Sequence, residues 1–480
     1  MEVVEPTRGR QRRGADATVV TLVSRHRWIL VILLVGVMLR LVTMLGFQPV
    51  IWFPDSYTYV VTAMRPSPDL VRPAGYSMFL LLLEVFHSFA VVALVQHLLG
   101  LAAGLIVYVT ARRVAPQWVA VLAAAPVLLD AYQIELEHLL VSDTLFASLL
   151  VIAVWLGLAP GRGRRTAAAA GLVLGALTLT RTVGLPLIVV FAGWYLIRRR
   201  PRQAAALTLA VLLPLAGYAG WFAAAHHRFG LIGANGVFLY ARTMAFADCS
   251  VMRPDPELAV LCDPRPPAER PPSQDYIWAP DSPLVRLPGI TFLASTDRLA
   301  GKFAALAISS QPGDYLASVI GELGRSFTWG RPVYPDQEVY DYYEFPAATP
   351  APPGRYPAQA GARLAVRYER GPIGTSINEP FAAVMRGYQR VVRLPGGALL
   401  IILLVPPAVA ALRRRRLGDP WALPWLTAAG LLVIPAATAE FDYRYVLPAV
   451  PLACLAAALA CYGSTTTRSS ESAVDRSADC

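Results

Sequence analysis

Ten apolar runs dominate this chain and restrict the folds that are open to it. A helix needs about 20 apolar residues to cross the roughly 30 Å hydrocarbon core of a bilayer. The runs lie at 28–47, 89–111, 117–134, 138–159, 166–180, 183–197, 203–224, 395–412, 420–438 and 445–462. With 55% hydrophobic and only 16% charged residues, the chain is too apolar for a soluble protein. We therefore predict an all-α polytopic membrane protein with about ten transmembrane helices. The runs 166–180 and 183–197 are short, and they fit either tilted spans or broken helices.

Arginines in the short connections orient these helices. Four connections, at 112–113, 162–165, 198–202 and 413–416, carry thirteen arginines and no carboxylate. All four fall on one side if the helices alternate, and the basic N-terminal arm falls on the same side. The positive-inside rule makes that side cytoplasmic, so we expect both termini in the cytoplasm and the first helix to be an uncleaved signal anchor. Because the arginines form no continuous stripe, the net charge of +11 does not indicate nucleic-acid binding.

Hydropathy and proline content divide the chain into five segments. They are a basic arm 1–27, a transmembrane module 28–224 with about seven helices, an extracytoplasmic domain 225–394, a module 395–462 with about three helices, and a disordered cytoplasmic tail 463–480. Apolar residues with helical spacing at 297–310, 311–329 and 376–392 predict a mostly helical extracytoplasmic domain. Cys249 and Cys262 are its only cysteines, and we predict a disulfide between them because the compartment is oxidising.

Asp55 is a lone carboxylate just beyond the first apolar run, in Trp-Phe-Pro-Asp-Ser-Tyr at 52–57. A charge at a membrane edge is costly, so it is interpreted as a functional site by default. A partly buried carboxylate there could take a proton from a sugar hydroxyl. The same residue could instead cap an interfacial helix over 56–64, because Pro-Asp-Ser is a favourable helix start. The two roles can coexist, and the local sequence leaves both open.

Several other polar residues are placed on the same side as Asp55. Three arginines are candidates for phosphate binding, because a guanidinium offers two parallel donors: Arg72, Arg181 and Arg444. The alternatives are a surface turn for Arg72, interfacial snorkelling or pairing with Asp143 for Arg181, and pairing with Asp442 or Glu440 for Arg444. Candidates for substrate contacts are Tyr57, Tyr76, His138, Asp143, Asp442 and Tyr443. The spacing of His138 with Glu135 and Glu137 does not suit zinc, so we predict no metal site there.

The order of these motifs resembles the polyprenyl-phosphate-dependent GT-C glycosyltransferases. The matching features are the acid in the first external loop at 48–75, Arg-Pro-Ala-Gly-Tyr at 72–76, Val-Ser-Asp-Thr-Leu-Phe at 141–146, Leu-Thr-Leu-Thr-Arg-Thr at 177–182 and Glu-Phe-Asp-Tyr-Arg-Tyr-Val-Leu-Pro at 440–448. The chain is similar to the dolichyl-phosphate-mannose mannosyltransferase-like and aminoarabinose transferase-like members. The resemblance covers roughly the first 225 and last 50 residues, and the arginine-rich composition suggests an actinobacterial source.

This resemblance implies an enzyme of the cell membrane. A sugar, mannose- or arabinose-like, would pass from polyprenyl phosphate to a glycan, lipid or protein acceptor outside the cytoplasm, such as a cell-wall glycan. The displacement would be inverting, with Asp55 as the general base. Many relatives carry two adjacent acids where this chain has Asp55-Ser56, so we expect no cofactor and do not favour a bound divalent cation. The main alternative is a transporter or flippase for a lipid-linked or polar solute, and a structural partner protein is a third.

Overall fold

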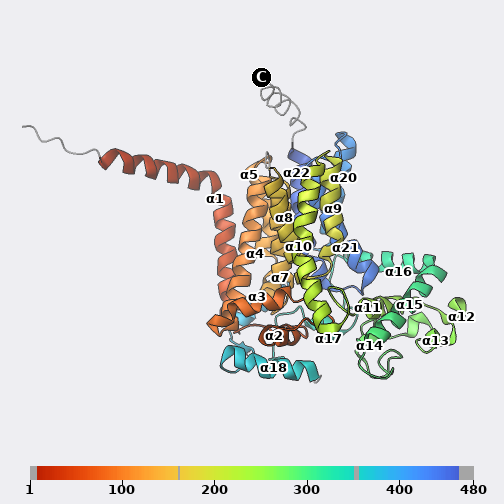
Figure 1. Cartoon of the computed structure of the whole chain (residues 1–480). Helices are drawn as coiled ribbons and strands as arrows, with labels where there is room; N and C mark the ends of the chain where they lie inside the picture. The colour runs from red at the N-terminus through yellow and green to blue at the C-terminus, as the bar shows by residue number, and fades with distance from the viewer. Residues whose placement is uncertain (1–7, 160–162, 351–355, 464–480) are drawn as a thin grey trace, which may run out of the picture.

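The computed structural model describes residues 8–159, 163–350 and 356–463. Within them the chain is mostly helical, which confirms the predicted helical class. Its two strands, β1 (Phe47–Gln48) and β2 (Ser376–Ile377), pair antiparallel. Figure 1 shows a bundle of long, roughly parallel helices, with shorter helices gathered at one end of the bundle and beside that end.

The bundle helices coincide closely with the predicted apolar runs. They are α1 (Arg8–Gly46), α4 (Phe89–Ala111), α5 (Gln117–Leu129), α7 (Asp143–Gly157), α8 (Arg164–Thr180), α9 (Gly184–Ile197), α10 (Pro201–His226), α20 (Gly396–Leu412), α21 (Ala422–Thr438) and α22 (Val450–Tyr462). Among the described residues, four stretches are long and apolar enough to cross a membrane: His26–Gly46, Phe89–Ala111, Pro201–His226 and Tyr443–Tyr462. A bent pair that begins with α5 would make a fifth span. The count of about ten transmembrane helices stays a prediction.

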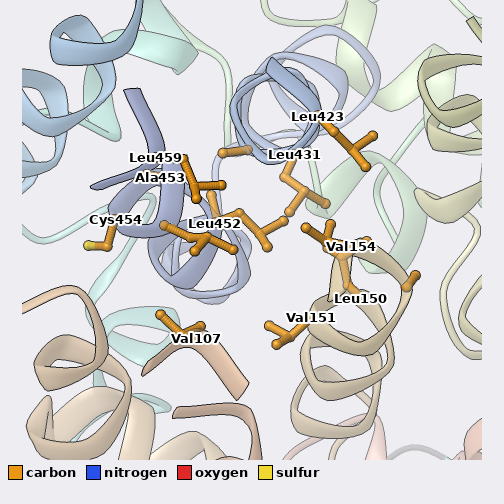
Figure 2. Close-up of a cluster of buried hydrophobic side chains, with 14 of the residues drawn as sticks. Val107, Leu150, Val151, Val154, Leu423, Leu431, Leu452, Ala453, Cys454 and Leu459 are labelled. Carbon is orange, nitrogen blue, oxygen red and sulfur yellow. The ribbon is translucent and has the colours of Figure 1, made fainter. Parts of the chain in front are cut away.

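Small residues let these helices approach closely. Gly171 and Gly175 form a Gly-x-x-x-Gly pattern on α8. A Cβ at Gly171 would lie 2.3 Å from the Leu207 carbonyl oxygen of α10, and one at Gly175 would lie 2.5 Å from Pro214. Backbone contact of this kind gives apolar helices the van der Waals packing that holds them together in lipid. Figure 2 shows part of the apolar core between α4, α7, α21 and α22, where Val107 and Val151 face Leu452.

Two of the predicted runs are interrupted in the structure. The run 117–134 breaks at Asp130, and α6 (Ala131–His138) leaves α5 at an angle of 47°. The Asp130 carboxylate accepts hydrogen bonds from the backbone N–H groups of Tyr132 and Gln133, and it therefore ends one helix and caps the next. The run 138–159 becomes helical only at Asp143, so the prediction of an unbroken helix is wrong for both runs.

Backbone pairing explains the second interruption. The Ile51 N–H donates to the His138 carbonyl (3.2 Å), and the Leu140 N–H donates to the Ile51 carbonyl (3.0 Å). The segment between α1 and the next helix therefore forms hydrogen bonds with the backbone of residues 138–140, which are then not available for a helix. The last predicted run is also modified, because two 3₁₀ turns, η3 (Tyr443–Tyr445) and η4 (Leu447–Ala449), precede α22.

Four short helices lie at one end of the bundle (Figure 1). They are α2 (Ser56–Met64), α3 (Gly75–Leu83), α17 (Gln337–Asp341) and α18 (Tyr356–Glu369), and η1 (Glu84–Phe86) continues α3. Helix α2 confirms the predicted helix over 56–64. Helix α18 packs directly on it, since a Cβ at Gly361 would lie 2.5 Å from the Tyr57 carbonyl oxygen.

The remaining helices come from the predicted extracytoplasmic segment. They are α11 (Asn235–Thr243), α12 (Cys249–Met252), α13 (Pro256–Ala259), α14 (Asp275–Trp278), α15 (Ala294–Ser310), α16 (Pro312–Arg325) and α19 (Phe381–Gln389), with η2 (Pro267–Glu269). Helices α15 and α16 confirm the predicted helices over 297–310 and 311–329. The predicted helix over 376–392 starts only at Phe381, because residues 376–377 form β2.

The structure contains a disulfide between Cys249 and Cys262, which closes a loop around α12 and α13. We expect Cys262→Ser to lower the free energy of unfolding of this region by about 2–4 kcal/mol, because the cross-link restricts the unfolded chain. Thermal unfolding of the purified protein with and without reductant would measure the change. Cys461→Ser, which removes a half-buried free thiol, is the control. An unfolding midpoint that neither Cys262→Ser nor reductant shifts would contradict the expectation.

Candidate functional site

The segment before α2 is held against the start of α7 by main-chain and side-chain hydrogen bonds. The Ser56 hydroxyl donates to the Leu140 carbonyl (2.7 Å) and accepts from the Phe53 N–H (2.9 Å). The His138 Nε2 atom lies 2.6 Å from the Phe47 carbonyl oxygen. These contacts fix the backbone on both sides of Asp55 and therefore its position at the end of the bundle.

Asp55 occupies the N-cap position of α2, as the sequence allowed, but its side chain does not cap the helix. It has helical backbone angles, φ −70° and ψ −26°, and its side chain makes no capping hydrogen bond to α2. Its carboxylate instead accepts hydrogen bonds from Arg72 Nη2 (2.5 Å) and Arg444 Nη1 (3.2 Å). The costly charge is therefore paired with two arginines, one of which comes from the other end of the sequence.

Asp55 belongs to a buried group of three aspartates and three arginines, called here the Asp55 cluster. Its members are Asp55, Asp143, Asp442, Arg72, Arg181 and Arg444. Arg181 pairs with Asp143, and Arg444 Nε donates to Asp442 (2.9 Å) while its Nη1 lies 3.9 Å from Asp143. The six side chains are between 0% and 20% exposed. Equal numbers of opposite charges offset the cost of removing each one from water.

One carboxylate oxygen of this cluster, Asp143 Oδ2, is buried without a hydrogen-bond partner among the described residues. Asp442 Oδ1 and the Tyr343 hydroxyl are also buried, and the hydroxyl lies within hydrogen-bonding reach of the Asp442 side chain. Buried polar atoms usually have partners, and exceptions call for an explanation such as a bound ligand. Carboxylate oxygens can accept hydrogen bonds from the hydroxyl groups of a polyol, and a phenol can either donate or accept them.

The two arginines determine the protonation state of Asp55. Burial by itself raises the pKa of this carboxyl, but the positive charges of Arg72 and Arg444 outweigh it and hold the pKa well below that of an ordinary aspartate. Asp55 is therefore ionised at neutral pH. It is also a weak base for as long as both arginines stay on it.

Aromatic rings surround the cluster, and sequence reasoning missed several of them. The Arg444 guanidinium lies 4.6 Å from the Phe53 ring centroid, and that of Arg181 lies 5.2 Å from the Tyr445 ring. Tyr343 packs 5.8 Å from Phe53 and brings the segment between α16 and α18 to the site. Its only sequence signal was the density of tyrosines at 340–343.

The other predicted substrate contacts lie outside the cluster. Tyr57 stacks on Trp52 (4.9 Å), and the Tyr76 hydroxyl donates to Gln96 (2.7 Å). The Tyr443 ring packs against the Tyr132 ring, with their centroids 5.1 Å apart, and so points away from the Asp55 cluster. His138 is fully buried in a separate network.

That second network joins α1, α4 and α6. Arg40 forms two hydrogen bonds with the Glu137 carboxylate, both of 2.7 Å. His97 Nδ1 lies 3.0 Å from Glu137, and His97 Nε2 lies 3.1 Å from His138 Nδ1. Gly100 makes room for the carboxylate, since a Cβ there would lie 1.9 Å from Glu137 Oε1. Arg40 and His97 were missed by sequence reasoning, although ionisable residues inside apolar runs are a recognised signal.

The described residues contain no group of three or more histidine, cysteine, aspartate or glutamate side chains arranged to hold a metal ion. Each aspartate of the Asp55 cluster is engaged with an arginine instead. The expectation that the protein needs no metal or cofactor stays a prediction.

Comparisons with known proteins give structural matches only. No protein-family model and no curated protein matches the sequence. The chain is similar to the oligosaccharyltransferase of Archaeoglobus fulgidus, solved with a tethered acceptor peptide, with 13% identity, a TM-score of 0.42, and coverage of 90% of this chain and 49% of that one. It is also similar to ArnT from Cupriavidus metallidurans bound to undecaprenyl phosphate, with 14% identity, a TM-score of 0.35, and coverage of 88% and 77%. This chain thus spans about half the length of the oligosaccharyltransferase.

Proposed function

We propose that this protein is an integral membrane glycosyltransferase that moves a sugar from a polyprenyl-phosphate donor to an acceptor outside the cytoplasm. The observation that carries the proposal is the buried Asp55 carboxylate, held by Arg72 and Arg444 at one end of an apolar bundle. The order of motifs in the sequence supports the same function. The mannose- or arabinose-like sugar and the acceptor class are proposals that rest on that resemblance alone.

The proposed reaction is a single displacement at the anomeric carbon. An acceptor hydroxyl gives its proton to Asp55 as its oxygen forms a bond to that carbon, while the bond from the carbon to the phosphate oxygen breaks. The products are the glycosylated acceptor and free polyprenyl phosphate. Arg72, Arg181 and Arg444 are the proposed partners of the leaving phosphate, because fixed guanidinium groups stabilise charge that develops there.

The ion pairs between Asp55 and the two arginines imply that donor binding precedes proton transfer in this mechanism. A donor phosphate that draws Arg72 or Arg444 away from Asp55 removes the charge that depresses the pKa of this carboxyl. Asp55 then becomes a stronger base only when the donor is bound. This would limit unproductive proton transfer in the free enzyme.

The experiment that tests the function uses membranes containing the protein and polyprenyl-phosphate sugars labelled in the sugar. We expect the label to appear in a product that is no longer attached to the lipid. Movement of intact donor across the bilayer, with no release of labelled sugar from the lipid, would indicate a flippase instead. The buried Arg40 and Glu137 pair is the feature that favours such a transporter, because ionisable residues within membrane helices often mark a transport pathway.

The pH dependence of transfer should follow the ionisation of Asp55. Because the pKa of Asp55 is depressed in the folded protein, its carboxylate stays ionised even below about pH 3.9, the pKa of an ordinary aspartate. The stabilising ion pairs are fully present above that pH and are lost only as the pH falls through the lower pKa of the folded state. We therefore expect kcat/KM, which reports on the free enzyme, to stay level down to about pH 4. The acid limb of kcat should lie at higher pH, since the bound donor withdraws an arginine. An acid limb of kcat/KM in the neutral range would assign the base to another residue.

A further inference from the structure

Helix α16 turns its polar side towards the rest of the protein and its apolar side outward. Glu322 lies on the inward side and is only 8% exposed, whereas Leu316 and Ile320 on the opposite side are 59% and 61% exposed. A helix at the surface of a water-soluble domain has the reverse arrangement, with its apolar stripe against the core. The polarity of α16 therefore suits an apolar medium outside it.

The outward side of α16 carries no charge along its length. Its exposed residues recur at the spacing of one helix face: Gly313, Leu316, Ala317, Ile320, Gly321 and Gly324. A Cβ at any of the three glycines would have no described atom within 4 Å. No part of the chain that the structure describes covers this side of α16 at those positions.

The inward side of α16 is hydrogen-bonded to the end of the bundle helix α21 and to the segment that follows it. The Tyr315 hydroxyl donates to the Ala437 carbonyl (3.0 Å), and the Phe441 N–H donates to the Glu322 carboxylate (2.6 Å). Because α21 ends at Thr438, these bonds place α16 at the level where the bundle ends. Figure 1 shows α16 lying across the direction of the bundle helices at this end.

The apolar outer surface of the bundle reaches the same level. Val433 of α21 is 45% exposed and lies one turn before Ala437, so the two residues share one side of the helix. Ile401 and Leu404 of the neighbouring helix α20 are 63% and 56% exposed. Exposed apolar side chains therefore continue from the bundle helices to the place where α16 is attached.

An exposed tryptophan follows α16 and marks this level independently. Trp329 is 69% exposed, and a Cβ at Gly397, in the first turn of α20, would lie 3.1 Å from its ring. Tryptophan is enriched where the hydrocarbon of a membrane meets water, because its ring is apolar and its N–H group is polar. The start of α20 and the end of α21 thus lie at the boundary where such a residue is expected.

We infer that the outward side of α16 lies in the lipid–water interface of the bilayer, with the helix parallel to the membrane plane. Leu316 and Ile320 contact lipid hydrocarbon, and Trp329 lies beside them at the boundary. Because Glu322 is bonded to Phe441, this contact also holds the adjacent Asp442 of the Asp55 cluster at the membrane surface. The inference goes beyond the proposed function, since it concerns how the protein is seated in the bilayer.

The test measures the environment of a nitroxide label on the full-length protein in phosphatidylcholine nanodiscs, with the free cysteines replaced by serine. Ile320→Cys carries the test label, Ile401→Cys is the bundle reference, and Lys302→Cys, at a position 62% exposed, is the aqueous control. Collisions with oxygen and with a water-soluble nickel chelate are compared. We expect the oxygen-to-chelate ratio at 320 to exceed that at 302 by about tenfold or more, because hydrocarbon excludes the polar chelate.

A second label position, Leu316→Cys, tests the orientation of the helix. A high ratio at 316 and at 320 supports the inference, whereas a high ratio at only one of them would overturn the parallel orientation. A ratio at 320 equal to that at 302 would place this side in water and overturn the inference. Labels at 320 that neither probe reaches, and that couple magnetically between two molecules, would overturn it in favour of a second copy packed on the small residues of this side. No substrate is present, so each result is independent of sugar transfer.

Discussion

Asp55→Asn is expected to reduce sugar transfer by roughly 10²–10⁴-fold, the usual contribution of a positioned general base. The amide has the shape of the carboxylate but cannot take the proton of the acceptor hydroxyl. Its oxygen can still accept a hydrogen bond from Arg72, so the variant should remain folded. Initial rates with a labelled polyprenyl-phosphate sugar, together with the thermal unfolding midpoint, would measure both effects.

The matched control for this prediction is Asp419→Asn. Asp419 lies in the connection between α20 and α21, and its carboxylate accepts a hydrogen bond from the Arg416 N–H (3.0 Å). The same chemical change there should leave transfer at the wild-type rate. Undiminished turnover by a folded Asp55→Asn protein would show that another group acts as the base.

Glu137→Ala is expected to destabilise the protein by about 3–5 kcal/mol, because it leaves the Arg40 guanidinium buried without its counter-charge. Both side chains are almost completely buried, at 3% and 0% exposure, so solvent cannot replace the lost partner. The unfolding midpoint in detergent would show the loss. Replacement of Arg40 and Glu137 together by methionine should recover much of it, since no charge is then left unpaired.

The exposed pair Glu257 and Lys302 provides the control for this experiment. Their side chains are 64% and 62% exposed, and their atoms are 3.5 Å apart. Exposed ion pairs are screened by water, so Glu257→Ala should change stability by less than about 0.5 kcal/mol. Equal effects of Glu137→Ala and Glu257→Ala would mean that the buried pair contributes no more than a surface contact.

The helices were the most predictable part of this protein. Helix α4 occupies the residues that the apolar run 89–111 predicts, and α2 occupies those that follow Pro-Asp-Ser. Both signals are local, because they depend on hydropathy and helix-start chemistry within one stretch of chain. The breaks at Asp130 and at 139–142 were not predictable in this way. They arise from contacts with distant parts of the sequence. The Leu394 N–H donates to the Asp130 carboxylate, and the Ile51 backbone forms hydrogen bonds with His138 and Leu140.

The candidate site shows the same division. The sequence identified Asp55 as a costly charge and offered Asp143 and Asp442 as partners for Arg181 and Arg444, because charges near apolar segments need compensation. It could not decide between a helix cap and a paired carboxylate for Asp55, since Ser56 and Pro54 favour a cap whatever lies across the bundle.

By itself, then, the sequence determined an apolar helical chain with a conspicuous acid after its first long helix, because hydropathy and helix boundaries are properties of neighbouring residues. Only the tertiary structure decided which charges pair with that acid. Arg72 and Arg444 lie 17 and 389 residues from Asp55, and Glu137 lies 97 residues from Arg40. Burial makes an unpaired charge costly, so each buried charge needs a partner, but no local pattern records which distant charge lies beside it once the helices pack.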